Sequence, residues 1–135
     1  MKKLSDILNE SKSVAVVGIS DKQERPSYRV AEYLKSAGYR IIPVNPRLQE
    51  VLGEKCYPSL DDIPTEVDIV DIFRRSEDVL PIVESAIRIG AKTIWMQEGI
   101  VNHEAAKIAQ NAGIQVVMDH CMLKEHKKIK CYDDG

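Results

Sequence analysis

The sequence predicts an α/β fold, a Rossmann-like doubly wound sheet of about five parallel strands in a single domain. Five short apolar runs, rich in Val and Ile, recur along the 135 residues, and most are continuous rather than alternating. That pattern is typical of strands covered on both faces, as in a parallel sheet. Helical patterns lie between these runs, and three of them stop at a glycine that leads into the next strand. Right-handed crossovers then bring the carboxyl ends of the strands to one edge of the sheet.

The expected strands and helices alternate along the chain. Pro81 must fall in the first turn of the second helix, where a missing N–H costs little, so we expect that helix to begin near Asp78. The third helix opens with Asn102, a residue type that favours N-caps. The predicted strands are Val14–Ile19, Arg40–Val44, Val67–Phe73, Lys92–Met96 and Ile114–Met118, and the predicted helices are Ser27–Ala37, Glu77–Ile89 and Asn102–Ala112.

Three segments lie outside this alternation. Residues 3–11 are expected to form a short amphipathic helix. Pro46–Pro64 contains three prolines and Gly53, so we expect an irregular crossover with one short helix near Ser59–Ile63. Residues 124–135 are expected to be a basic C-terminal tail, in which Lys124–Lys130 forms a solvated helix end. Residues 1–135 would thus make up one domain.

Composition and charge exclude several classes of protein. Hydrophobic residues make up 44% of the chain and charged residues 30%, a balance typical of ordered soluble domains. The net charge of -2 gives no reason to expect a nucleic acid or an acidic membrane as partner. No apolar run approaches the roughly 20 residues that a membrane span needs, and the N-terminus lacks the continuous apolar stretch of a signal peptide. We therefore expect a cytoplasmic protein.

The three cysteines give no sign of a disulfide framework or of a metal site. Cys56, Cys121 and Cys131 are an odd number at unpatterned spacings. His120, Cys121 and His126 lie near one another in the sequence but have no further ligand close by, and such groupings are common by chance. We expect no metal.

Residues that suit a phosphate follow the first predicted strand. Gly18 permits a tight turn, and the loop then reaches a helix start at Pro26–Ser27. The free N–H groups and the dipole of a helix N-terminus favour an anion. Ser20 and Ser27 add hydroxyl groups at the same place, and Arg25 adds a charge. The alternative is a plain turn with a capping serine and a solvated arginine.

The residues after the second strand argue against NAD. A dinucleotide site usually follows this strand with Asp or Glu, which bonds the ribose hydroxyls. Here the strand leads into Asn45-Pro46-Arg47, and the second and third glycines of GxGxxG are absent. A cation at this position suits a phosphate on the adenosine ribose, which leaves NADP and coenzyme A as ligands. Taken alone, Arg47 is equally consistent with a solvated loop residue.

The third and fourth strands also end in polar residues. Phe73-Arg74-Arg75 forms a positive spot, and the Phe73 ring suits contact with an adenine or a pantetheine arm. The alternative for this stretch is that Ser76 or Asp78 caps the next helix. Gln97-Glu98-Gly99 follows the fourth strand. Because Glu98 is a poor neighbour for a phosphate, we expect it to order the loops or to meet the uncharged part of a ligand.

Five motifs, in this order and at compatible spacing, resemble the small stand-alone CoA-binding domain family. They are VAVVGIS, IIPVNP with LGEKCYPSL, VDIVDIFRR, GAKTIWMQEGI and AGIQVVMDHCM. That family is similar in turn to the N-terminal, CoA-binding domain of the succinyl-CoA synthetase α subunit. The resemblance extends from about Ser13 to Met122, and it implies a Rossmann-like, nucleotide-binding domain that takes CoA at the carboxyl-terminal edge of its sheet.

The resemblance also implies roles for individual positions. The loop Gly18–Ser20 would lie on the pyrophosphate side, Asn45–Arg47 near the adenosine end, Phe73 and Arg74 along the cofactor, and Gln97–Gly99 in the loop after the fourth strand. The loop GISDKQERPS is poorer in glycine than its counterpart in the synthetase. The predicted cofactor-binding residues are Gly18, Ile19, Ser20, Arg25, Pro26, Ser27, Asn45, Pro46, Arg47, Phe73, Arg74, Arg75, Gln97, Glu98 and Gly99.

From this resemblance we expect binding of coenzyme A or an acyl-CoA without catalysis. The synthetase carries its phosphorylated histidine in a later domain, and His103, His120 and His126 do not substitute for it. An NADP-dependent oxidoreductase or NADP-binding module is one alternative, although the chain has no evident Tyr–Lys proton donor. A second alternative is a CoA-linked thiol-exchange site at Cys121, beside His120. The sequence also leaves open whether the protein forms a homo-oligomer or acts with an unidentified protein partner.

Overall fold

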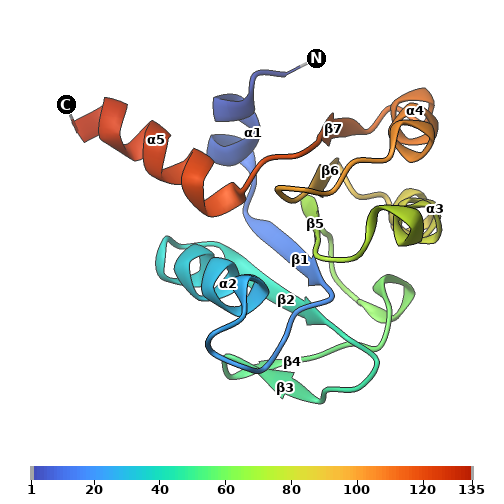
Figure 1. The fold of residues 1–135 in the computed structure, drawn as a ribbon, viewed down its shortest axis with the longest axis horizontal. Coiled ribbons are helices and arrows are strands. Elements are labelled where there is room, and N and C mark those ends of the chain that lie inside the picture. Colours follow the sequence, from blue (N-terminus) through green and yellow to red (C-terminus); the bar gives the residue numbers. More distant parts are fainter. Residues whose placement is uncertain (1, 135) are drawn as a thin grey trace.

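Five parallel strands form the central sheet of the protein. The computed structural model describes residues 2–134, and the side chains up to residue 130. The strands are Ser13–Val17 (β1), Arg40–Val44 (β2), Ile69–Ile72 (β5), Thr93–Met96 (β6) and Gln115–Val117 (β7). Their order across the sheet is β2-β1-β5-β6-β7 (Figure 1). After β1 the chain forms β2 on one side of β1, and it later forms β5 on the other side of β1. The loops that follow β1 and β5 therefore diverge from each other. The predicted α/β fold is confirmed.

The three central strands are buried along their whole length. Every residue of β1, β5 and β6 is buried, which explains the continuous apolar runs in the sequence. The register pairs Val16 with Asp71 and Asp71 with Trp95, so these three residues form one row across the sheet. This row lies close to the carboxyl ends of the strands.

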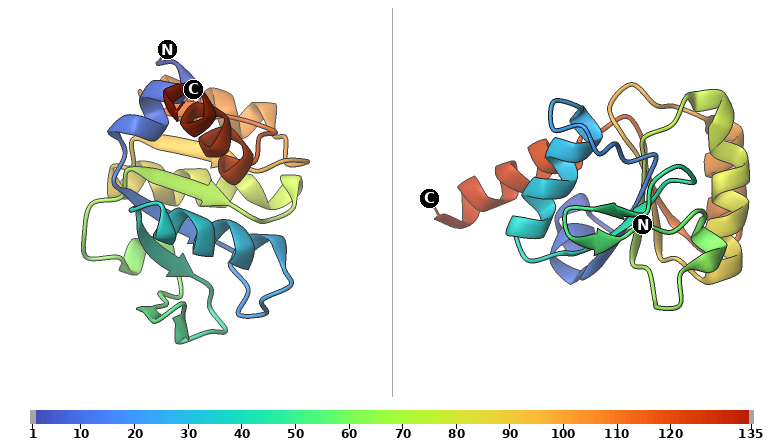
Figure 2. Two further views of the ribbon diagram at one scale, coloured as in Figure 1. Left: turned by 90° about the vertical axis from the view of Figure 1, so that its left-hand side faces the viewer. Right: turned by 90° about the horizontal axis from the view of Figure 1, so that it is seen from below.

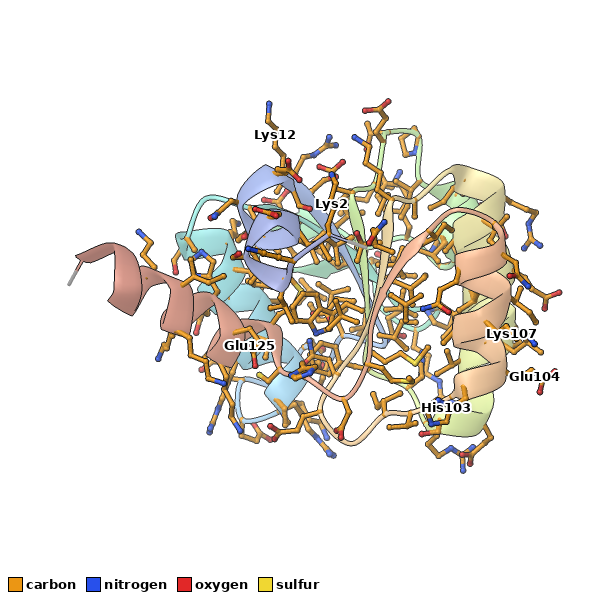
Figure 3. The ribbon with its side chains drawn as sticks, turned by 90° about the horizontal axis from the view of Figure 1, so that it is seen from above. Lys2, Lys12, His103, Glu104, Lys107 and Glu125 are labelled. Carbon is orange, nitrogen blue, oxygen red and sulfur yellow. The ribbon has the colours of Figure 1, made fainter. Side chains whose placement is uncertain are left out.

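Helices cover both faces of the sheet (Figures 2 and 3). One face packs against α1 (Leu4–Glu10), α2 (Pro26–Ser36) and α5 (Met122–Asp134), and the other packs against α3 (Val79–Ile89) and α4 (His103–Asn111). Figure 3 shows Glu104 and Lys107 projecting from α4 away from the sheet. The outer face of α4 is therefore charged, while its inner face contributes alanines to the core.

Local signals in the sequence explain where the helices begin and end. A short 3₁₀ turn, Ser76–Asp78, precedes α3, so Pro81 is the third residue of that helix and removes no helical hydrogen bond. The side chain of Asn102 caps α4 by accepting a hydrogen bond from the Ala105 N–H (2.9 Å). Gly90 ends α3 in the left-handed conformation, with φ of 74°.

The crossover from β2 to β5 contains more structure than the expected irregular segment. It carries a small antiparallel hairpin, Glu50–Val51 (β3) and Glu54–Lys55 (β4), followed by a 3₁₀ turn at Leu60–Asp62. The hairpin turn places Leu52 and Gly53 at φ of 56° and 76°, a two-residue turn that normally calls for Asn-Gly. Because leucine rarely adopts this conformation, the sequence Leu52-Gly53 did not predict a hairpin turn.

The segment expected to be a solvated tail forms α5, which packs against the domain along part of its length. Met122 and His126 are buried on this helix, and the Tyr33 hydroxyl hydrogen-bonds to His126 Nδ1 (2.8 Å). The rings of Tyr33 and Tyr39 both meet the His126 imidazole edge to face. Residue 135 and the side chain of Cys131 lie outside the described residues.

Candidate functional site

The loop after β1 approaches the neighbouring strand too closely for any side chain. Gly18 has φ of 86°, and its N–H donates to the Val44 carbonyl of β2 (2.9 Å). A Cβ added at Gly18 would fall against the Phe73 carbonyl oxygen, closer than real Cβ atoms come, and beside Arg74. Glycine is therefore required here for two independent reasons. The contact holds the ends of β1, β2 and β5 together at one edge, which we call the rim: the residues after β1, β2, β5 and β6.

The start of α2 leaves polar groups available at the rim. Pro26 is the first residue of this helix, and within the described chain no side chain caps its N-terminus. The Ser20 N–H donates to Ser27 Oγ (3.0 Å), and the Lys22 N–H donates to Ser20 Oγ (3.1 Å). Ser27 is buried beneath this turn. The Ser20 hydroxyl proton, together with the first N–H groups of α2, suits an anion.

Asn45 ties the loop after β2 to the loop after β1. Its Nδ2 donates to the Ile19 carbonyl (2.8 Å), and its Oδ1 accepts from the Arg47 N–H (2.8 Å). The Asn45 side chain thus fixes a turn in its own loop as well as the position of Ile19. The turn exposes Pro46 and Arg47 to solvent. Arg47 forms no ion pair among the described residues.

Two hollows lie beside Arg74, just after β5. One has a volume of about 220 Å³ and runs between the ends of β1 and β2 and the start of α3; it is lined by Val17, Val44, Pro46, Pro58, Ser59, Leu60, Arg74, Pro81, Ile82 and Ser85. The other, of about 520 Å³, is wider and more open, and is lined by Phe73, Arg74, Arg75, Asp78 and Ile100. Pro58–Leu60 and Ile100 are not among the predicted cofactor-binding residues, although the motifs YPSL and QEGI contain them.

The polar groups of the loop after β6 are bonded to other parts of the chain. Gln97 is only 4% exposed, because its side chain points inward and donates from Nε2 to Asp71 Oδ1. Glu98 is exposed and forms an ion pair with Lys124 of α5 (3.0 Å). The Gly99 N–H donates to Asp119 Oδ1 (2.6 Å). These contacts order the loop, as expected for Glu98, and they turn both acidic and amide groups away from the hollows.

Arg75 contributes less charge to the rim than the sequence suggests. Its Nε lies 3.3 Å from Asp78 Oδ2 and 3.6 Å from Glu77 Oε1, and its side chain is largely exposed. Two carboxylates therefore offset this guanidinium. Arg25, Arg47 and Arg74 form no ion pair among the described residues, and neither does Lys22 in the loop after β1. The same loop also carries two carboxylates, Asp21 and Glu24.

Asp71 is a buried acid that is not among the predicted site residues. It lies in β5 within the run VDIVDIF and is fully buried. Burial raises the pKa of the Asp71 carboxyl to about 8, while the hydrogen bond from Gln97 acts in the opposite direction. Its Oδ2 has no hydrogen-bond partner within the described chain. A strand register, which a lone sequence does not supply, was needed to see that Asp71 meets Gln97.

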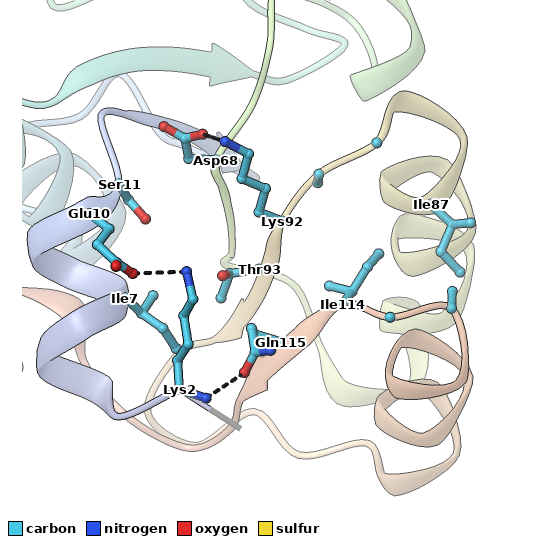
Figure 4. A pocket seen from close by; sticks show the side chains of 14 residues that line it. Lys2, Ile7, Glu10, Ser11, Asp68, Ile87, Lys92, Thr93, Ile114 and Gln115 are labelled. Carbon is cyan, nitrogen blue, oxygen red and sulfur yellow. Dashed lines mark hydrogen bonds and ion pairs between the residues drawn. The ribbon is translucent and has the colours of Figure 1, made fainter.

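A separate cavity of about 490 Å³ lies at the opposite, amino-terminal edge of the sheet (Figure 4). Its charges are already paired: Lys2 Nζ lies 2.8 Å from Glu10 Oε2, and Lys92 Nζ lies 3.3 Å from Asp68 Oδ1. The Lys2 backbone N–H donates to Gln115 Oε1 (3.0 Å) on the cavity wall. Because the lysines that line this cavity pair with carboxylates that also line it, the cavity is better explained as a gap between packed elements than as a binding site for an anion.

Cys121 and its neighbours lie at the start of α5. The Cys121 thiol is free and partly exposed, and the Cys121 carbonyl accepts the Glu125 N–H (3.0 Å). His120 Nδ1 lies 3.3 Å from Glu125 Oε1, so the imidazole is directed to a carboxylate. The described residues contain no cluster of three or more His, Cys, Asp or Glu that could hold a metal ion. None of the described helices combines the length and the apolar character needed to cross a membrane.

Comparison with known proteins bears on this rim. Residues 12–127 match the family described as CoA binding domain. The chain belongs to the CoA-binding domain family. This match contains every rim residue discussed above, from Gly18 to Gly99.

This CoA-binding domain is similar both to small proteins of about its own length and to one part of longer enzymes. An uncharacterized protein of Bacillus subtilis, YneT, is 42% identical over 127 residues, which are 94% of each chain. Acetate–CoA ligase (ADP-forming) II of Archaeoglobus fulgidus is 39% identical over 101 residues, 73% of this chain but only 15% of the ligase. A solved structure of a hypothetical protein from Pyrococcus horikoshii has a TM-score of 0.90 at 44% identity, covering 92% of this chain and 87% of that one. The domain thus occurs both in small proteins and within CoA ligases.

Proposed function

We propose that this CoA-binding domain binds coenzyme A or an acyl-CoA at the rim and catalyses no reaction by itself. The observation that carries the proposal is that one edge of the sheet holds three arginines without an ion pair among the described residues, together with a helix N-terminus that no described side chain caps. That edge also carries the close contact between Gly18 and Phe73, where the loops diverge. Coenzyme A is a polyanion with phosphates at two separated places, and the rim offers cations at separated places.

The pyrophosphate fits the region between the Gly18 turn and the start of α2. Backbone N–H groups there face no side-chain cap, and the hydroxyl groups of Ser20 and Ser27 lie next to them. The tight turn at Gly18 lets a ligand approach the backbone, because no Cβ stands in the way. Arg25 adds a positive charge immediately before the helix.

The adenosine 3′-phosphate fits the turn after β2. Asn45 holds this turn in place, and Arg47 is exposed without a carboxylate partner in the described chain. An acidic residue at this position would favour the free ribose hydroxyls of NAD, and none is present in Asn45-Pro46-Arg47. The wider hollow beside Phe73 and Arg74 suits the pantetheine arm, which is largely uncharged.

Isothermal titration calorimetry tests this proposal directly. We expect coenzyme A and acetyl-CoA to bind the purified protein, NAD to give no measurable binding, and NADP to bind more weakly than coenzyme A. Tighter binding of NADP than of coenzyme A would overturn the proposal in favour of a nicotinamide site. Formation of a CoA thioester from acetate and ATP by the purified chain would overturn its non-catalytic part.

A further inference from the structure

A buried carboxyl group lies directly beneath the proposed ligand site. Asp71 is two residues before Phe73 on β5, and its Oδ1 accepts the hydrogen bond of Gln97, the first residue after β6. Val16 of β1 and Trp95 of β6 flank it in register. Asp71 Oδ2 is the one buried side-chain oxygen or nitrogen without a hydrogen-bond partner among the described residues.

The surroundings of Asp71 contain nothing that compensates a negative charge. A carboxylate that is fully buried needs a cation or several hydrogen-bond donors, and Asp71 has the single amide of Gln97. The apolar layer around it comes from β1, β6, α2 and α5. Toward the rim lie Arg25 before α2, Arg74 after β5, Glu98 paired with Lys124, and His120 directed to Glu125. The other charged groups of the covering helices are exposed: Arg29, Glu32 and Lys35 of α2, and Lys127, Lys128 and Lys130 of α5. The buried His126 of α5 is hydrogen-bonded to Tyr33. The raised pKa of Asp71 fits this lack of partners.

We propose that Asp71 is a positioning residue that is neutral when coenzyme A binds, so that ligand binding is coupled to uptake of a proton from solvent by that fraction of the Asp71 carboxyl groups that is ionised in the free protein. This inference rests on the proposed function. It goes beyond that function because it assigns a pH-dependent control to a residue that does not itself contact the ligand.

The coupling follows from two contacts of Gln97. The Gln97 side chain is held by Asp71, while its backbone carbonyl accepts the Ile100 N–H (2.8 Å), which closes the turn after β6. The state of Asp71 is therefore transmitted to the loop that borders the hollow at Ile100. An ionised Asp71 would in addition place a buried negative charge under an anionic ligand, where the low dielectric strengthens the repulsion.

The sign of the effect is fixed by linkage. An anionic ligand favours the protonated carboxyl, so the pKa of Asp71 is higher in the complex than in the free protein. Between these two values the complex binds more protons than the free protein, and affinity falls as pH rises through that window. Since the pKa of the free protein is about 8, the window lies on the alkaline side of neutrality.

Calorimetric titration with acetyl-CoA, which has no free thiol, tests the coupling. We expect wild-type affinity to fall about tenfold between pH 7 and pH 9.5, as for a pKa displaced by about one unit. We also expect proton uptake near pH 8.5, seen as a dependence of the binding heat on the ionisation enthalpy of the buffer. Asp71→Asn, a neutral isostere, should bind like wild type at pH 7 and show less than about half of the pH dependence.

A second variant separates the hydrogen bond from the charge. In Gln97→Leu the donor to Asp71 is lost, so the transition should move to higher pH. Carbon-13 NMR of the Asp71 carboxyl should follow the same transition in the protein without ligand. If wild type and Asp71→Asn both bind acetyl-CoA with the same pH dependence, the proton coupling is overturned and the proposed function stands. No binding by either protein would overturn the proposed function as well.

Discussion

Two arginines at opposite ends of β2 are both exposed and form no ion pair among the described residues, but they have different expected roles. Arg40 begins the strand and Arg47 follows its end, and both side chains are exposed. The strands run parallel, so one arginine lies at the amino-terminal edge of the sheet and the other at the rim. Any difference between them therefore reports on position and not on residue type or exposure.

Replacing Arg47 by Ala should weaken coenzyme A about tenfold. A charge-assisted hydrogen bond to the 3′-phosphate is worth roughly 1.5–3 kcal/mol, and exposure places it in the lower part of that range. The substitution should leave 3′-dephospho-CoA unchanged, because that ligand lacks the partner group. Arg40→Ala is the matched control and should alter neither ligand. Titration of both ligands against the three proteins checks this, and an equal loss for both ligands in Arg47→Ala would contradict it.

Gly18 and Gly99 separate backbone conformation from close packing. Both have positive φ, 86° and 87°, but only Gly18 has another chain segment where a Cβ would stand. A residue other than glycine at such a φ costs roughly 1–2 kcal/mol by itself. Gly99→Ala should lose about that much in the free energy of unfolding. Gly18→Ala should lose clearly more of the free energy of unfolding, and it should also lose binding of coenzyme A. Denaturant unfolding of the two variants measures the difference in stability. Equal losses would mean that the contact with Phe73 relaxes freely.

At the scale of elements, the docking of α5 depends on a histidine. His126 is buried between α5 and the tyrosines Tyr33 and Tyr39, and burial, with a smaller contribution from Lys130, lowers the pKa of its imidazole. The folded state therefore favours the neutral form of this side chain. A charged imidazole at this place would disrupt the packing of the helix.

His126 and Asp71 should change the stability in opposite directions as the pH is lowered from 7 to 5. The folded-state pKa of His126 lies below its unfolded value, so at this side chain the unfolded chain binds more protons and unfolding becomes easier as pH falls. The folded-state pKa of Asp71 lies above its unfolded value, so at that carboxyl the folded chain binds more protons and folding is favoured as pH falls. His126→Gln cannot be charged, so lowering the pH from 7 to 5 should change its stability more favourably than that of the wild type. Denaturant unfolding at both pH values measures the two slopes. Parallel slopes would mean that other groups control acid sensitivity.

The elements also show what a sequence can and cannot predict. Strands and helices were predictable because apolar runs and glycine stops are local signals, as at Gly90. The β3–β4 hairpin was not, because its strands have two residues each and its turn uses Leu52, whose carbonyl is bonded by Lys35 from α2. The rim was predictable because parallel strands end at one edge. The Asp71–Gln97 pair was not, since it depends on strand register.

The whole molecule has two chemically different ends. The rim offers a polyanion arginines that form no ion pair within the described chain, whereas the cavity at the opposite edge has its lysines paired with carboxylates. A ligand that binds this end joins loops from four strands and stabilises the domain as a unit.

Coenzyme A should accordingly raise the melting temperature of the whole protein. A ligand at about 100 times its dissociation constant adds roughly 2.7 kcal/mol to the free energy of unfolding. For a chain of this size, that corresponds to a shift on the order of 5–10 °C. NAD at the same concentration should give no shift. Differential scanning calorimetry measures both, and a shift with NAD as large as that with coenzyme A would contradict the charge argument.

The parallel strand order has a consequence for the speed of folding. No two neighbouring strands of the main sheet are joined by a hairpin, so each pairing waits for the closure of a long connection. The rim comes into being only after four such strands are aligned. A ligand that needs the finished rim has nothing to bind in the folding transition state. Coenzyme A should therefore slow the unfolding of this protein and leave its refolding rate unchanged, which would lengthen the lifetime of the folded molecule without helping it to form.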